Sequence, residues 1–202
     1  MCLLKKDLAI NKMLNFEIIT KIFSDFFNNP GKNFEYNQKI EKLVWLNIKT
    51  NRTLWDLEDS ARLVELGDKH VSETKRKIDK NNQTRNDLIR KMDMEIVNLF
   101  SVSPGSQENL YSESPGMIID RLAIIFIKLS VIQNLLSVIQ EDNLKKEYEE
   151  KKNILLNQID RIGAFLDSYF SKLASKEVFF EVQQPIKIYN DKRVKKYIKI
   201  IK

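Results

Sequence analysis

Helix-breaking residues are rare in this chain, and their scarcity limits the possible folds more than any other feature. Among 202 residues there are only 5 glycines and 4 prolines. Sandwiches and barrels need many tight turns, and those turns depend on these two residue types. The sequence therefore predicts an all-α fold, a single-domain bundle of about five long helices that covers residues 1–191.

Apolar residues recur at helical spacing along five segments, and each segment predicts one helix. The expected helices cover roughly residues 3–29, 36–66, 69–100, 114–139 and 153–173. Ser114 suits the N-cap of the fourth helix, and Pro115 suits its first helical position. This helix is apolar on nearly every side, so we expect it at the centre of the bundle.

Two further segments are less regular. Residues 140–152 are rich in charge, which is typical of a solvated helix face. Residues 177–191 lose the helical period and predict a short irregular or extended segment near the C-terminus.

The chain contains one cysteine, Cys2, and one histidine, His70. A disulfide within the chain is excluded, and histidine-based metal sites and catalytic triads are nearly excluded. Neither a secretory signal nor an apolar stretch of about 18 residues that could span a membrane is visible. The sequence thus predicts a cytoplasmic protein with His70 at its surface.

Positive charge is concentrated at the C-terminus. The net charge is +6, and residues 192–202 contain six lysines or arginines and no acid. The rest of the chain is neutral, which argues against nucleic acid as a partner. The apolar residues of this basic tail fall on one helical face, so the tail could lie on an anionic membrane surface, peripheral to the inner membrane. A solubilising tail is the alternative.

Residues 80–87 contain no apolar side chain, although they lie inside the third expected helix. Ile78 and Ile89 are eleven positions apart, which is close to three helical turns. The apolar stripe therefore resumes on the same face, and the helix is expected to continue through the polar stretch. Asn82 and Arg85 then take positions that face the core.

Charged residues surround this stretch and need partners where they are buried. Asp79, Gln83 and Asp87 follow one another at four-residue spacing, with Arg76 one turn before Asp79 and Arg90 three residues after Asp87. The candidate partners on the second and fourth helices are Trp55, Glu58, Asp59, Arg62, Asp120 and Arg121. Two interpretations stay open: a closed, buried polar network that fixes helix packing, or a network with one wall open to a ligand.

Five motifs occur in an order that is similar to a known family. They are LWDLED (54–59), KRKIDKNNQTRNDLI (75–89), SESPGMIIDRLAI (112–124), ILLNQIDRI (154–162) and KIYND (187–191). Together they resemble a family of bacterial proteins catalogued as domain of unknown function 4254, over about residues 38–191. The resemblance implies an all-helical fold and an association with the synthesis of lipopolysaccharide and other surface glycans. It implies no reaction.

The resemblance also marks individual positions. The residues that match the family pattern are Trp55, Glu58, Asp59, Lys75, Arg76, Asp79, Asn82, Gln83, Arg85, Asp87, Glu113, Pro115, Asp120, Arg121, Tyr189, Asn190 and Asp191. Most of them are the polar residues that the helical phase already singles out. The family tends to follow its YND motif with a Leu-Asn-Pro ending, which the basic tail replaces here.

Three functions suit this set of residues. The leading hypothesis is an accessory or interaction protein linked to surface-glycan synthesis, acting with a protein partner or as a homodimer. The alternative is an enzyme or binding module for a phosphorylated sugar or nucleotide, in which arginines bind phosphate and amides bind hydroxyl groups. The third is a Mg²⁺ site built from Glu58, Asp59, Asp79 and Asp87. Interleaved arginines would neutralise such a site, so no cofactor is expected.

Overall fold

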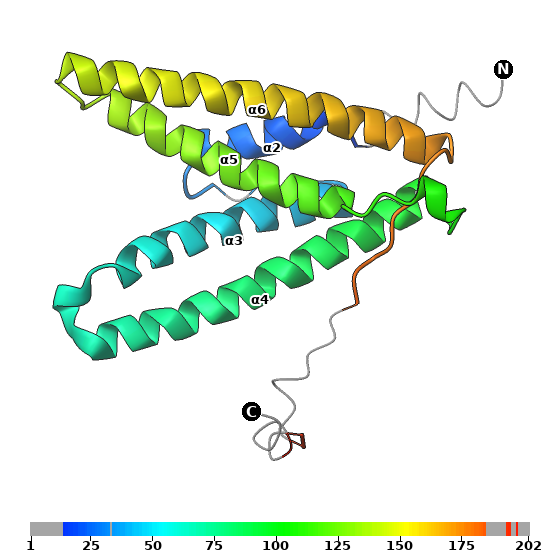
Figure 1. Ribbon diagram of the computed structural model, residues 1–202, viewed down its shortest axis with the longest axis horizontal. Helices are drawn as coiled ribbons and strands as arrows, with labels where there is room; N and C mark the ends of the chain where they lie inside the picture. The colour runs from blue at the N-terminus through cyan, green and yellow to red at the C-terminus, as the bar shows by residue number, and fades with distance from the viewer. Residues whose placement is uncertain (1–13, 33, 185–192, 195–196, 198–202) are drawn as a thin grey trace.

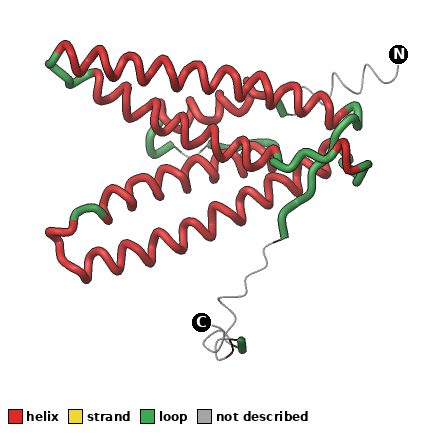
Figure 2. Tube along the Cα trace, in the orientation of Figure 1, coloured by secondary structure: helices red, strands yellow, loops and turns green. Residues whose placement is uncertain are grey.

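The computed structural model describes residues 14–32, 34–184, 193–194 and 197. Five α-helices occur in this part of the chain: α2 (Phe16–Asn28), α3 (Lys39–Ala61), α4 (Gly67–Phe100), α5 (Pro115–Leu136) and α6 (Asp142–Ala174). Two short 3-10 helices, Val64–Leu66 and Gln107–Asn109, lie in the connections. The described residues contain no β-strand (Figure 2), so the predicted all-α bundle is confirmed.

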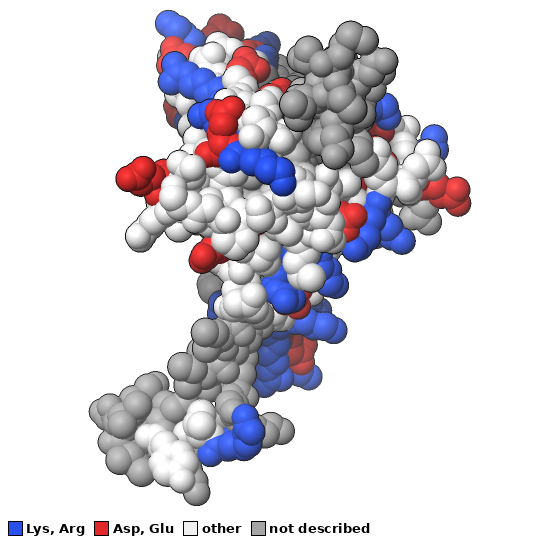
Figure 3. All heavy atoms as spheres, turned by 90° about the vertical axis from the view of Figure 1, so that its right-hand side faces the viewer, with Lys and Arg blue, Asp and Glu red and all other residues white. Residues whose placement is uncertain are grey.

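The helices form two hairpins that meet at one end of the molecule and spread apart at the other (Figure 1). One hairpin consists of α3 and α4, and the other of α5 and α6. Helix α2 lies between the two hairpins and packs on α3, α5 and α6. The α4–α5 loop and the segment after α6 gather at the end where the hairpins meet, and Figure 3 shows mostly uncharged atoms at the centre of that end.

Helix α5 forms the centre of the bundle, as its all-round apolar sequence predicts. It packs on all four other helices, and its buried side chains include Ile118, Ile119 and Leu122. The ring of Phe23 on α2 meets that of Phe126 on α5 edge-on, with 5.1 Å between the ring centres. Burial of these large apolar side chains supplies the main driving force for folding.

Local sequence signals set the ends of the helices. The Ser114 side chain accepts a hydrogen bond from the backbone N–H of Met117, and Pro115 is the first residue of α5, as predicted. Gly67 adopts a φ of +85°, which a residue with a side chain rarely tolerates. This glycine therefore allows the chain to turn sharply between α3 and α4.

Several expected boundaries differ from the structure. Helix α3 ends at Ala61 rather than near residue 66, and residues 62–66 instead form a turn and a 3-10 helix. Helix α6 begins at Asp142, before residue 153, so the charged stretch is indeed a solvated helix face; Lys151 and Glu147 form an ion pair of 2.6 Å on it. Phe179, in the segment expected to be irregular or extended, forms an isolated parallel bridge with Leu110.

His70, which was expected at the surface, is partly exposed. Its Nε2 lies 3.2 Å from the Oγ of Ser60, so the side chain ties the start of α4 to the end of α3. No helix among the described residues is long and apolar enough to cross a membrane. Residues 3–13 of the first expected helix, and most of the basic tail, lie outside the described residues.

A candidate ligand cleft between α4 and α5

Asp120 is the centre of a polar network that joins three helices. The residue is 6% exposed, and its Oδ1 accepts hydrogen bonds from the side-chain amides of Asn47 and Asn51 on α3, both at 2.8 Å. Its Oδ2 faces Arg85 on α4, whose Nε lies 3.6 Å away. A carboxylate that loses its hydration needs such partners, because an isolated buried charge is strongly unfavourable.

Arg85 connects this network to the outside. Its 3.6 Å separation from Asp120 is within the range of an ion pair but too long for a hydrogen bond. The Arg85 Nε is buried, and no described residue accepts a hydrogen bond from it. The side chain is nevertheless 31% exposed. The network is therefore buried at Asp120 and open at Arg85.

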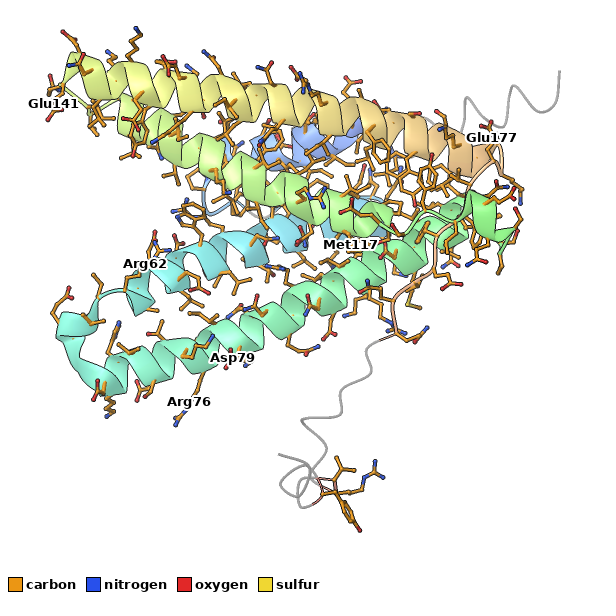
Figure 4. The ribbon with its side chains drawn as sticks, viewed as in Figure 1. Arg62, Arg76, Asp79, Met117, Glu141 and Glu177 are labelled. Atoms are coloured by element: carbon orange, nitrogen blue, oxygen red, sulfur yellow. The ribbon has the colours of Figure 1, made fainter. Side chains whose placement is uncertain are left out.

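A cleft of about 600 Å³ lies beside Arg85, between α4 and the first half of α5, and we call it the α4–α5 cleft. It is lined by Gln83, Arg85, Asn86, Asp87, Ile89, Arg90, Asp93, Glu113, Met117, Asp120, Arg121, Ile124, Gln183 and Gln184. The two glutamines come from the segment after α6, and the Gln183 amide lies 3.9 Å from the sulfur of Met117, which is labelled in Figure 4. The volume is within the range of small-molecule pockets.

Three arginines reach the α4–α5 cleft, and they differ in how fully they are paired. Arg121 is exposed and forms an ion pair with Glu113. Arg85 faces Asp120. Arg90 is half-buried, and within the described ranges its buried Nε has no hydrogen-bond partner and no carboxylate lies within 4.0 Å of its nitrogens. Arg90 is therefore the least compensated cation of the cleft.

Asp93 is a buried acid of this cleft that the sequence analysis did not single out. It is 2% exposed, and its Oδ2 accepts a hydrogen bond from the Ser114 hydroxyl at 2.7 Å. Its Oδ1 accepts one from the backbone N–H of Gly116 at 2.8 Å. Burial raises the pKa of Asp93 from 3.8 to about 6, although both hydrogen bonds act to lower it. Its carboxyl group holds the start of α5 against α4.

The close approach of the two helices at this point depends on a glycine. A Cβ atom at Gly116 would lie 2.5 Å from Asp93 Oδ1 and 2.8 Å from the carbonyl oxygen of Ile89. The preceding loop is anchored to α6, because the Tyr169 hydroxyl donates to the carbonyl oxygen of Glu113 at 3.1 Å. The wall of the cleft formed by the start of α5 is thus fixed from both sides.

A smaller neighbouring cleft of about 280 Å³ is lined by expected site residues that do not reach the α4–α5 cleft. They are Trp55, Glu58 and Asp59 of α3, and Asn82 of α4. Arg85 and Ile124 line both clefts, so the two are adjacent. Asp59 does not reach Asp120 or Arg85 and instead forms an exposed ion pair of 2.9 Å with Arg62.

The remaining expected residues are distributed differently. Gln83 and Asp87 line the α4–α5 cleft, where the Gln83 amide donates to Asp87 Oδ1 at 2.7 Å. Asp79 is exposed and pairs with Lys75 at 3.3 Å. Arg76 is exposed and points away from the bundle (Figure 4). Tyr189, Asn190 and Asp191 lie outside the described residues.

No group of three or more histidine, cysteine, aspartate or glutamate side chains in the described part of the chain is placed to hold a metal ion. The four carboxylates suggested for Mg²⁺ are separated accordingly. Glu58 and Asp59 line the smaller cleft, whereas Asp79 lines neither cleft and Asp87 lines the α4–α5 cleft.

Asn47, Asn51 and Asp93 are important for the site, and none of them was predicted. A signal was present for the two asparagines, because they continue the apolar stripe of Ile40 and Val44 on the buried face of α3. Amides at such positions need hydrogen-bond partners and therefore point to a buried acceptor. There was less reason in the sequence to expect a buried Asp93. This residue follows the buried Met92, but it is not one of the regularly spaced apolar positions of α4.

The fold and the cleft define a helical bundle with a polar site that is lined by three arginines and four acidic residues and is open to solvent on one side. The chain belongs to the family described as Protein of unknown function (DUF4254), which matches residues 41–182, more than half of its length. The family resemblance is thereby confirmed, and four of the five motifs lie within the match, whereas KIYND at 187–191 lies beyond it. Neither a curated protein nor a solved structure matches the chain.

Proposed function

We propose that this protein is a binding module for a phosphorylated sugar and that the α4–α5 cleft is its binding site. The observation that carries the proposal is Arg90, a half-buried arginine without a carboxylate partner among the described residues, which lines an open cleft of about 600 Å³. An uncompensated cation in a concave site is an attractive position for an anion.

Phosphate recognition would fall to Arg90 and Arg85. The guanidinium group is planar and offers several N–H donors in a fork that fits two phosphate oxygens. Both side chains have a buried Nε that donates no hydrogen bond to another described residue. A phosphate in the cleft would contact the outer nitrogens of the two guanidinium groups rather than the buried Nε atoms. We assign the phosphate to this pair rather than to Arg121, because Glu113 already neutralises Arg121.

Sugar recognition would use the amides and the carboxylate along the rest of the cleft. Gln83, Asn86 and Gln183 provide side-chain amides that can both donate to and accept from hydroxyl groups, and Asp87 provides an acceptor. Met117, with Ile89 and Ile124, gives the cleft an apolar side on which the carbon face of a sugar ring could pack.

We propose binding in the α4–α5 cleft without a chemical reaction. The most deeply buried acid of the cleft, Asp93, already uses both oxygens to hold Ser114 and Gly116, so it supports the framework. Binding without turnover suits an accessory protein. A sugar phosphate is also a ligand that fits surface-glycan synthesis, the setting that the family resemblance implies.

A thermal-shift screen tests the proposal. Sugar 1-phosphates, sugar 6-phosphates and nucleotide sugars would each be added at about 5 mM. A ligand present at ten times its Kd should raise the Tm by about 2 to 6 °C for a domain of this size, because it binds only the folded state. Free sugars and inorganic phosphate should raise it less. No increase with any phosphorylated sugar would contradict the proposal.

Substitutions then show whether the shift arises in the α4–α5 cleft. Arg90→Met keeps the length of the apolar stem and removes the charge, and it should abolish most of the shift. Lys91→Met is the matched control, because Lys91 is exposed, adjacent and not part of the cleft. Arg85→Met should also abolish the shift if the folded state survives. An unchanged shift in Arg90→Met would exclude this cleft as the site.

A further inference from the structure

A second pocket, of about 440 Å³, shares no residue with the α4–α5 cleft. It lies where the end of α2 and the turn at residues 29–32 meet α3 and the second half of α5. We call it the aromatic–lysine pocket after the residues that define it: Phe26, Phe27, Lys32, Trp45, Lys49 and Asn134.

Three aromatic rings form one side of this pocket and hold one another in place. The Phe26 ring meets that of Phe27 edge-on at 5.2 Å between centres, with 82° between the planes. It also meets the Trp45 ring at 6.5 Å and 75°. Trp45 is half-buried, and its indole N–H donates to no other described residue. Packed aromatic rings of this kind offer a flat, apolar surface to a ring-shaped ligand.

The charges of the pocket all have one sign. Lys32, Lys49 and Arg52 line it, and no acidic residue does. Arg52 is neutralised by Asp56 at 2.9 Å. The ammonium group of Lys49 lies 4.9 Å from the centre of the Trp45 ring, and neither this lysine nor Lys32 has a carboxylate within 4.0 Å in the described part of the chain. Two exposed lysines without a carboxylate partner therefore line the pocket. The Lys49 ammonium group lies over the aromatic wall, and that of Lys32 lies 5.3 Å from the centre of the Phe34 ring, outside the pocket.

We propose that the aromatic–lysine pocket binds a nucleotide. The base would pack on the ring of Trp45 in the place of the Lys49 ammonium group, which lies 4.9 Å from the ring centre in the free protein. This group would move to the phosphates, which Lys32 would also bind. The Asn134 side-chain amide, on the α5 side, can hydrogen-bond to the edge of the base or to the ribose. A nucleotide should bind more tightly than phosphate alone, because its base contacts the aromatic rings. It should also bind more tightly than a nucleoside, because its phosphates contact the lysines. This inference is independent of the proposed sugar-phosphate site.

Tryptophan fluorescence provides a direct test. The chain contains two tryptophans, so a Trp55→Phe variant leaves Trp45 as the single reporter. Adenosine diphosphate, titrated to about 5 mM, should quench this fluorescence in a saturable manner. Adenosine and inorganic phosphate, each titrated alone, should bind at least about tenfold more weakly, since each lacks one of the two recognised parts. Equal affinity for either of them, or no quenching by the nucleotide, would overturn the proposal.

Charge variants in the same background locate the phosphate contacts. Lys49→Gln should weaken nucleotide binding about tenfold. Lys42→Gln is the matched control, because Lys42 is exposed on the same helix and does not line the pocket. Lys32→Gln should weaken binding in a similar way and covers the case in which the first variant does not fold. Arg90→Met should leave the quenching unchanged, so that failure of one site is distinguished from failure of the other. Unchanged affinity in both lysine variants would contradict the assignment.

Discussion

Replacing Asp120 by alanine should lower the free energy of unfolding by about 3 to 5 kcal/mol. The substitution removes the acceptor of two buried amides, Asn47 and Asn51, and leaves the Arg85 guanidinium group without its carboxylate partner. Unsatisfied buried donors are costly, and an unpaired cation that is only partly exposed adds to this cost. Urea unfolding at pH 7, followed by circular dichroism, measures the change.

Two further variants control this result. Asp87→Ala removes an exposed acid of the same cleft that accepts one hydrogen bond, and it should cost no more than about 0.5 kcal/mol. The double variant Asp120→Ala/Arg85→Met removes both charges, so it should be less destabilised than the sum of its two single changes. A loss below about 1 kcal/mol for Asp120→Ala would show that the network does not hold the three helices together.

The pH dependence of stability should carry a signature of Asp93. Burial raises the pKa of Asp93 to about 6, against 3.8 in the unfolded chain, so the folded state favours the protonated acid. This contribution to stability is fully present below pH 4 and is lost as the pH rises through 6. The shift of about 2 pKa units corresponds to roughly 2 to 3 kcal/mol, at about 1.36 kcal/mol per unit.

Comparison with Asp93→Asn isolates this effect. The asparagine amide can donate to the Ser114 hydroxyl while its oxygen accepts from the Gly116 N–H, so both hydrogen bonds of the native side chain can be kept. The free energy of unfolding of the native protein minus that of the variant should fall by about 2 to 3 kcal/mol between pH 4 and pH 7. Urea unfolding of both proteins at several pH values measures this difference. A constant difference across this range would contradict the raised pKa.

The sequence was sufficient to predict that α4 is continuous, because the apolar residues before and after the polar stretch fall on the same face of a helix. Ile78 and Ile89 both contact the interior, the first fully buried and the second half-buried, and the helix runs unbroken between them. The same phase places Arg85 toward α5, where the structure pairs it with Asp120. Periodicity gives the direction of a side chain on its own helix, and this was sufficient for these residues.

The positions of Arg76 and Asp79 could not be predicted in the same way. Helical periodicity predicts the side of α4 on which these two residues lie. Whether they are buried depends on whether another helix packs against that side. The two hairpins spread apart toward the start of α4 (Figure 1), so α5 does not cover this part of the helix. Arg76 and Asp79 are consequently exposed. Crossing angles between helices are tertiary properties, and the residues of a single helix do not reveal them.

The polar partners on α3 were missed for a different reason. Buried charges are expected to have charged partners, and Glu58 and Asp59 were therefore predicted opposite Asp120 and Arg85. Both lie further along α3, at the smaller cleft. The structure uses the neutral amides of Asn47 and Asn51 instead. Neutral donors stabilise a buried carboxylate with a smaller loss of hydration energy than a second charge would suffer. Polar residues on an apolar stripe are therefore the better guide to a buried acid.

Isothermal titration calorimetry with the sugar monophosphate that gives the largest thermal shift tests the central claim most directly. The native protein and the Lys91→Met control should bind it at one site with the same Kd. Arg90→Met should bind at least about tenfold more weakly, because one charge-assisted hydrogen bond of about 1.5 kcal/mol or more is lost. Equal Kd values for Arg90→Met and the native protein would contradict an arginine-lined phosphate site in the α4–α5 cleft.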